Sequence, residues 1–148
     1  MRQRILGVIG AGTCDEATAE RAYRVGQLLA EAGCVVVNGG RGGVMEAASR
    51  GAAEAGGTVL GILPDADPAT ANDWVTLPVA TGMGDARNAI ITNTAEAFVA
   101  VAGSHGTLSE IAYALKRGKR VVCLGSWNVD PALIVAETPE EAVERVLE

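Results

Sequence analysis

Aromatic residues make up only 3% of this 148-residue sequence, which has a single phenylalanine. Proteins that hold single-stranded nucleic acid stack bases on exposed aromatic rings, so this scarcity argues against that function. Positive charge is scarce as well, because 12 lysines and arginines face 18 acidic residues and leave a net charge of −6. A polyanion would meet a repulsive long-range field. We therefore predict no nucleic-acid partner.

Long apolar segments and paired cysteines are also missing. No stretch approaches the roughly 20 apolar residues of a membrane span, and the N-terminus lacks the apolar core of a signal peptide. Cys14, Cys34 and Cys123 form no Cys-x-x-Cys pair, and their odd number leaves at least one thiol free. Unpaired cysteines of this kind are typical of proteins in a reducing compartment. We predict a cytoplasmic protein without a membrane partner or metal site, in which Cys14 is either an apolar filler or a reactive loop thiol.

Short aliphatic runs are abundant, and they alternate with helical patterns along the whole chain. Runs without polar alternation are typical of parallel strands covered on both faces, and parallel neighbours need crossover helices. The sequence predicts an α/β fold, a Rossmann-like three-layer αβα sandwich with a mainly parallel sheet, built by residues 1–148 as one domain. The predicted strands are Ile5–Ile9, Cys34–Val37, Val59–Leu63, Ala97–Val101 and Val121–Leu124, with a weaker one near Trp74–Leu77.

Helix boundaries are marked by capping patterns. Three Thr-x-x-Glu patterns predict capping boxes at helix starts, and glycines after the helical segments predict their ends. A proline in the first helical position supports the last of these helices. The three boxes are Thr13 to Glu16, Thr107 to Glu110 and Thr138 to Glu141, with Pro139 after the third, and the ends are Gly33, Gly56 with Gly57, and Gly118.

Glycine is concentrated in the segments that follow the predicted strands, and all these segments share one edge of a parallel sheet. Glycine lets the backbone approach a ligand, and each following helix N-terminus carries free N–H groups and about half a positive charge. A tight strand-to-helix turn also needs glycine, but several such loops on one edge favour an anion site. The predicted phosphate-binding residues are Gly10, Gly12, Thr13, Gly39, Gly40, Gly42, Gly43, Gly103, Ser104, His105, Gly106 and Thr107.

Familiar nucleotide-binding patterns do not fit these loops. The first loop has Asp15 where Gly-x-Gly-x-x-Gly needs its third glycine, and the second strand ends in Asn38 where a ribose-binding acid is expected. No loop contains Gly-Lys-Ser/Thr, and the only lysines, Lys116 and Lys119, are predicted on the opposite edge. The sequence therefore disfavours a dinucleotide dehydrogenase, a P-loop NTPase and a lysine Schiff-base enzyme.

Three further side chains are candidates at the glycine-rich edge. Arg87 falls in the first turn of a helix, where a cation opposes the macrodipole by up to about 1 kcal/mol, so we expect an anion beside it. That anion is a ligand, or else a side chain such as Asp85 or Glu110. Glu110 also has a plainer role as capping partner of Thr107. His105, the only histidine, contacts the ligand or simply fills its loop.

These residues resemble the LONELY GUY family, often labelled lysine decarboxylases, whose relatives include molybdenum-cofactor carrier proteins. The family places an arginine fifteen residues before Pro-Gly-Gly-x-Gly-Thr-x-x-Glu, and here Arg87 precedes 102–110, Ala-Gly-Ser-His-Gly-Thr-Leu-Ser-Glu, by that spacing. The segment 39–45, Gly-Gly-Arg-Gly-Gly-Val-Met, is similar to the family's Gly-Gly-Gly-x-x-Gly-Leu-Met loop. The resemblance adds Met45 to the candidate ligand-binding residues.

In the hydrolase members, the arginine and glutamate at the positions of Arg87 and Glu110 are catalytic. They cleave the N-glycosidic bond of a nucleoside 5′-monophosphate, releasing the base and ribose phosphate. A carboxylate beside the ribose stabilises an oxocarbenium-like transition state, which makes this role chemically reasonable. The chain departs from the hydrolase pattern at Asn88, Ala102 and Ser104, and its shorter length is closer to the carrier-like branch. That branch is implied to hold the molybdenum cofactor, a phosphorylated pterin.

Three functions stay open at this point. The first is a binding or carrier protein for a phosphorylated heterocycle, either the molybdenum cofactor or a nucleoside monophosphate, with no cofactor of its own required. The second is a phosphoribohydrolase that uses Arg87 and Glu110, and the third is a nucleotide-sensing regulator. The resemblance also implies a homodimer or higher homo-oligomer. Ala89, Ile90 and Ile91 are a candidate interface, unless they pack on their own sheet.

Overall fold

The computed structural model describes residues 2–148, and every strand in it joins one sheet. The chain alternates strands and helices from its N-terminus, as the aliphatic runs predict. The elements are β1 (Ile5–Gly10), α1 (Glu16–Glu31), β2 (Val35–Asn38), α2 (Val44–Glu54), β3 (Val59–Leu63), η1 (Pro68–Thr70), β4 (Leu77–Ala80), η2 (Gly84–Ala86), α3 (Arg87–Thr94), β5 (Ala97–Val101), α4 (His105–Lys116), β6 (Arg120–Leu124), β7 (Ile134–Val135) and α5 (Pro139–Leu147).

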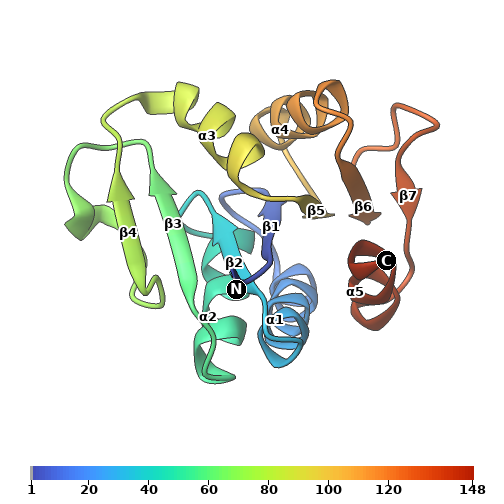
Figure 1. Cartoon of the computed structure of the whole chain (residues 1–148), viewed down its shortest axis with the longest axis horizontal. Helices are drawn as coiled ribbons and strands as arrows, with labels where there is room; N and C mark the ends of the chain where they lie inside the picture. Colours follow the sequence, from blue (N-terminus) through green and yellow to red (C-terminus); the bar gives the residue numbers. More distant parts are fainter. Residues whose placement is uncertain (1) are drawn as a thin grey trace.

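The sheet has seven strands in the order β4-β3-β2-β1-β5-β6-β7, and every neighbouring pair is parallel. Figure 1 shows α3 and α4 along one side of the sheet and α1, α2 and α5 along the other. Because successive side chains of a strand point to opposite faces, β1 serves both layers. Leu6 and Val8 pack under α1, α2 and α5, whereas Ile9 packs under α3 and α4. The predicted three-layer α/β fold is confirmed.

The five strands predicted from uninterrupted aliphatic runs are all present, but two further strands differ from expectation. The strand expected near Trp74–Leu77 lies instead at β4, Leu77–Ala80. β4 is an edge strand whose four residues are all exposed, so no buried pattern marks it. β7 is only two residues long and was not predicted, because two residues carry no periodicity.

Two of the three predicted capping boxes are wrong. Asp15 caps α1 by accepting the Thr18 N–H at 2.8 Å, so Thr13 belongs to the preceding loop. Ser104 is the N-cap of α4, and Thr107 lies within the first turn, where its hydroxyl accepts the Ser104 N–H. The cap at Thr138 is confirmed, with the Glu141 N–H donating to its hydroxyl at 3.1 Å. The helix-ending glycines are confirmed by positive φ at Gly33, Gly56 and Gly118.

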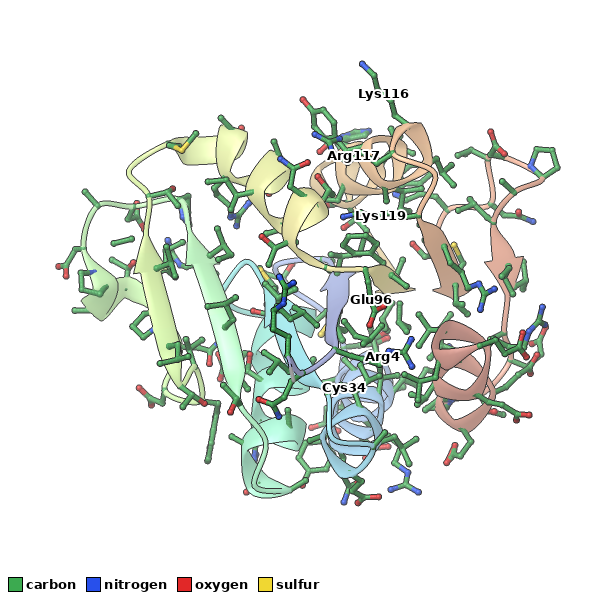
Figure 2. All side chains as sticks on the ribbon, in the orientation of Figure 1. Arg4, Cys34, Glu96, Lys116, Arg117 and Lys119 are labelled. Carbon is green, nitrogen blue, oxygen red and sulfur yellow. The ribbon has the colours of Figure 1, made fainter. Side chains whose placement is uncertain are left out.

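Both lysines lie away from the carboxyl edge of the sheet. Lys119 precedes β6, and its ammonium group donates to the carbonyls of Thr92, Asn93 and Ala95 at 2.6, 3.0 and 2.6 Å. It therefore closes the C-terminal end of α3, where a cation is favourable. Figure 2 labels Lys119 and Lys116 together with Arg4 and Glu96, which flank the starts of β1 and β5 and form an ion pair. The prediction that no lysine reaches the glycine-rich edge is confirmed.

The apolar face of α3 mainly serves its own domain core. Ile91 is fully buried with Phe98 and Ile111, while Ala89 and Ile90 are partly buried. This supports the alternative that the segment packs on its own sheet. Among residues 2–148, no helix is long and apolar enough to cross a membrane.

Candidate functional site

The strand order creates a switch point beside β1. From β1 the chain proceeds through α1 to β2 on one side, whereas β5, on the other side, is followed by α4 on the opposite face of the sheet. Ligands of open α/β sheets bind in the crevice outside the carboxyl ends of the strands at such a point. The loops that flank this crevice are 11–15 and 102–104, with 39–43 next to the first of them.

The first two glycine-rich loops are in direct contact. The Val44 N–H donates to the Ala11 carbonyl at 3.0 Å. Gly43 has a φ of 63°, and a Cβ there would lie 2.3 Å from the Ala11 oxygen. A Cβ at Gly10 would lie 2.4 Å from the Val101 oxygen, at the end of β5. Glycine is therefore required at 10 and 43, because any side chain would push the three strand ends apart.

Asn38 shapes the second loop from within the core. Its side chain is fully buried, and its amide nitrogen donates to the Ser49 hydroxyl at 2.9 Å and to the Met45 carbonyl at 3.2 Å. Its amide oxygen accepts the Gly40 N–H at 2.8 Å. All these bonds are internal, so Asn38 does not replace a ribose-binding acid. Its role is to hold the 39–43 loop in place under the start of α2.

The loop after β5 has an unusual backbone. Ala102 has a φ of 51°, the one non-glycine residue with positive φ among residues 2–148, and its N–H donates to the Leu124 carbonyl at 3.2 Å. The indole N–H of Trp127 donates to the Ser104 carbonyl at 3.0 Å. The His105 ring stacks on Trp127 with their centroids 6.2 Å apart and an interplanar angle of 25°. Trp127 thus supports the start of α4, and His105 has a fixed neighbour.

Arg87 extends from the start of α3 across the second loop. Its Nε–H donates to the Ile62 carbonyl at 2.9 Å, and a second guanidinium nitrogen donates to the Asn88 side-chain oxygen. A Cβ at Gly39 would lie 2.6 Å from its third nitrogen, so glycine at 39 makes room for the guanidinium. Burial lowers the Arg87 pKa, and the charges of Glu110 and Asp85 partly offset this. Neither acid is within ion-pair distance of it in the described chain.

Glu110 is buried beside Arg87 rather than at the helix cap. Its side chain is 8% exposed, and within residues 2–148 its carboxylate accepts no hydrogen bond. Burial raises the Glu110 pKa from 4.5 to about 7, although the positive charge of Arg87 acts in the opposite direction. The predicted capping-box role is therefore wrong. A buried carboxyl group facing an arginine without an ion pair is an arrangement typical of a functional site.

Arg41 is a candidate that the sequence reasoning did not single out. It lies in the middle of the second loop, where it forms an ion pair with Asp65 at 2.5 Å. The Asn72 side chain also donates to the Arg41 carbonyl at 2.9 Å. Its charge lowers the Arg87 pKa, which places the two cations at the same edge. An arginine inside a run of glycines was the available signal for it.

Two surface cavities bear on the position of the site. The smaller, about 530 Å³, lies at the glycine-rich edge and is lined by Asp85, Ala86, Asn88, His105, Gly106, Ser109 and Tyr113. The larger, about 670 Å³, lies between α1 and α2 and is lined mainly by Glu20, Tyr23, Arg24, Glu46 and Arg50. It shares only Gly43 with the predicted cradle. We take the smaller cavity as the candidate site, because its lining includes His105 and Gly106 of the predicted cradle and residues next to Arg87 and Glu110 in the chain.

The remaining predicted residues lie around this edge with different exposure. Gly12, Thr13 and Gly106 are exposed, and a Cβ at Gly12 would meet no atom within 4 Å, so that position is open. The Met45 sulfur lies against Gly39, beside the Arg87 guanidinium. Cys14 lines the larger cavity, and burial together with Asp15 raises its pKa, which disfavours a reactive thiolate. The structure therefore brings the loops, Arg87 and Glu110 together, whereas the Cys14 side chain lines the other cavity.

A model of the SLOG cluster4 family matches residues 3–147. The chain belongs to this family. A relative from Archaeoglobus fulgidus, an uncharacterised protein, is 52% identical over 143 residues, which cover 97% of this chain and 94% of the relative. The resemblance to the LONELY GUY superfamily and its carrier-like branch is confirmed.

Two solved structures of cofactor-binding proteins have the same fold. The molybdenum cofactor binding protein from the phototrophic bacterium Rippkaea orientalis is 36% identical, with a TM-score of 0.94 over 99% of this chain and 97% of that one. The Moco carrier protein from Chlamydomonas reinhardtii is 37% identical, with a TM-score of 0.89 over 99% and 96% of the two chains. Their sheets and helices therefore correspond to those of this protein over nearly their whole length.

Proposed function

We propose that this protein is a carrier that binds a phosphorylated heterocycle, and that the molybdenum cofactor is its cargo. The observation that carries the proposal is the convergence of three glycine-rich loops and the Arg87 guanidinium at the switch point of the sheet. Backbone N–H groups at helix N-termini bind phosphate without any need for net positive charge. The similarity to a cofactor-binding protein and a carrier protein supports the same conclusion.

The residues at this edge fit the phosphate of such a cargo. The start of α4 presents free N–H groups after Gly103, and the nearby Ser126 hydroxyl is buried without a hydrogen-bond partner in the described chain. A Cβ at Gly103 would lie 3.2 Å from that hydroxyl, so the orphaned group lies at the segment 103–107, which we call the phosphate loop. Arg87 supplies a half-buried cation beside Gly39. An oxyanion in this position would compensate the arginine at the start of α3.

The backbone at Ala102 favours a carrier over a hydrolase. The hydrolase motif has proline at this position, but proline requires a φ near −65° and has no N–H. Here the residue has a φ of 51° and uses its N–H to bond Leu124. The loop that begins the motif therefore has a conformation that the hydrolase sequence cannot adopt. This changes the approach to α4 at the place where a sugar phosphate would be positioned.

A hydrolase remains the second candidate because of Glu110. A carboxyl group with a pKa of about 7 is ionised in roughly half of the molecules at neutral pH, which suits a general acid or base. Arg87 would then hold the phosphate or ribose hydroxyls while Glu110 stabilises positive charge on the sugar. Both roles use the same two side chains, so turnover distinguishes the candidates better than binding.

Native mass spectrometry of the purified protein, with molybdopterin and AMP added separately, tests the proposal. The AMP sample is then assayed for free adenine. We expect a retained phosphorylated ligand without adenine release, and a weakened complex in Arg87→Ala. Steady adenine release that is lost in Glu110→Gln would overturn the carrier and establish the hydrolase.

We also propose that the protein self-associates, as the family resemblance implies. Light scattering after size exclusion is expected to give a mass that is a multiple of the 15.1 kDa chain. Only a 15.1 kDa species would overturn this.

A further inference from the structure

The 530 Å³ cavity contains hydrogen-bonding and aromatic groups that phosphate binding does not use. It lies between the α3 start and the outer face of α4, and it shares His105 and Gly106 with the phosphate loop. Its volume is within the range of about 300–1,000 Å³ that small-molecule sites occupy. A ligand held by its phosphate at the loop would therefore have its remaining part at the mouth of this cavity, which we call the side pocket.

Two rings make the side pocket suitable for a planar group. Tyr113 is 41% exposed, and the Arg117 guanidinium lies over its ring, 5.1 Å from the ring centroid, and holds the ring in place. His105 is held by Trp127, whose own indole is fixed by the Ser104 carbonyl. Exposed but immobilised rings are favourable stacking partners, because little side-chain entropy is lost on binding.

Asp85 supplies the carboxylate of the side pocket, and among residues 2–148 no group donates a hydrogen bond to its side chain or forms an ion pair with it. Arg87 lies two residues away, yet its nitrogens bond Ile62 and Asn88 and form no ion pair with Asp85 within residues 2–148. The Asn88 side-chain oxygen already accepts a hydrogen bond from the Arg87 guanidinium. The Ser109 hydroxyl donates to the Gly106 carbonyl at 2.7 Å. Asp85 thus remains as an acceptor with two oxygens, and a carboxylate in this form accepts only.

We propose that the side pocket holds the heterocycle of the ligand, and that Asp85 selects a ring that presents an N–H beside an amino group. This proposal rests on the proposed phosphate-binding function and specifies its substrate class. The 2-amino-4-oxopyrimidine ring of guanine and of pterins has such an edge, and it can donate two parallel hydrogen bonds to one carboxylate. Adenine has an acceptor nitrogen beside its amino group, so it can donate only one.

Isothermal titration calorimetry with GMP, AMP and ribose 5-phosphate separates the side pocket from the phosphate loop. A bidentate pair discriminates between bases by about 1–3 kcal/mol, which corresponds to roughly 5- to 150-fold in affinity. We expect GMP to bind at least about tenfold more tightly than AMP, and ribose 5-phosphate to bind more weakly than either. Molybdopterin, measured alongside GMP, shows whether a pterin or a nucleotide is the preferred source of the ring.

Variants assign the effect to individual side chains. Asp85→Asn is expected to weaken GMP and molybdopterin by about tenfold while AMP and ribose 5-phosphate change less than about twofold. Tyr113→Ala is expected to weaken GMP and AMP alike by about tenfold, because stacking does not depend on the edge of the base. Asp73→Asn, an exposed carboxylate outside the side pocket, is the matched control and should change none of these affinities.

The outcomes distinguish failure of the two proposals. If ribose 5-phosphate binds and Arg87→Ala weakens it, but GMP gains nothing over AMP or Asp85→Asn leaves GMP unchanged, then the side-pocket proposal is overturned and phosphate binding stands. If none of the four compounds binds, both proposals fail.

Discussion

Replacing Glu110 by glutamine should stabilise the protein at alkaline pH and leave it nearly unchanged at pH 4.5. Burial raises the Glu110 pKa from 4.5 to about 7, so the folded protein binds a proton that the unfolded chain releases between these values. The protonated Glu110 side chain therefore makes its whole contribution to the free energy of unfolding below pH 4.5, and this contribution is lost as the pH rises through 7. A pKa difference of this size lowers the free energy of unfolding by on the order of 3 kcal/mol once the carboxylate is charged.

Urea unfolding of wild type and Glu110→Gln, followed by tryptophan fluorescence between pH 4.5 and 8.5, measures this difference. Trp127 contacts the loop before α4, so its fluorescence reports on the relevant region. We expect the variant to gain about 2–3 kcal/mol over wild type at pH 8, with a difference that shrinks toward zero at pH 4.5. Subtraction removes the contribution of every other titrating group. Glu144→Gln, which replaces an exposed glutamate on α5, is the matched control for the substitution itself.

A variant that is less stable than wild type at pH 8 would refute this reasoning, since it would mean that the carboxylate is satisfied by the protein itself. The predicted result would instead mark Glu110 as a residue kept at a cost in stability, as is common where a site needs an unpaired charged group.

Three other substitutions test separate parts of the structure. Ala102→Gly should raise the unfolding free energy by about 1 kcal/mol, because glycine tolerates the φ of 51°, whereas Ala102→Pro should lower it by more than about 3 kcal/mol in the same urea assay. Lys119→Met removes three bonds to the end of α3 and should cost about 1–2 kcal/mol in thermal unfolding without changing ligand affinity, so an affinity loss would contradict its purely structural role. Gly43→Ala should reduce ribose 5-phosphate binding at least about tenfold in calorimetry, because a Cβ clashes with the Ala11 carbonyl and separates the first two loops; unchanged binding would show that their contact is dispensable.

Most of the fold could be predicted from local sequence patterns, because the buried strands kept the aliphatic runs that mark them. Five strands buried on both faces leave uninterrupted aliphatic runs, and these were located within about one residue. The exposed edge strand β4 and the two-residue β7 leave no such pattern, which is why the first was misplaced and the second missed. Parallel topology alone then placed the glycine-rich loops on one edge.

The site was predicted less completely, because side-chain directions decide it. The Thr107 to Glu110 spacing fits a capping box, yet α4 begins one turn earlier than that box requires, and Glu110 consequently points into the core beside Arg87. Arg41 and the side pocket depend on contacts between residues far apart in the chain. Local sequence patterns contain no information on such contacts.

The most direct test of the central claim is a ¹⁵N-resolved NMR titration of the protein with ribose 5-phosphate, which this 15.1 kDa chain permits. The account predicts that the largest amide shifts fall at Gly10–Thr13, Gly39–Gly43 and Gly103–Thr107, and that they vanish in Arg87→Ala. Shifts confined instead to the cavity between α1 and α2, around Tyr23 and Arg50, would contradict it.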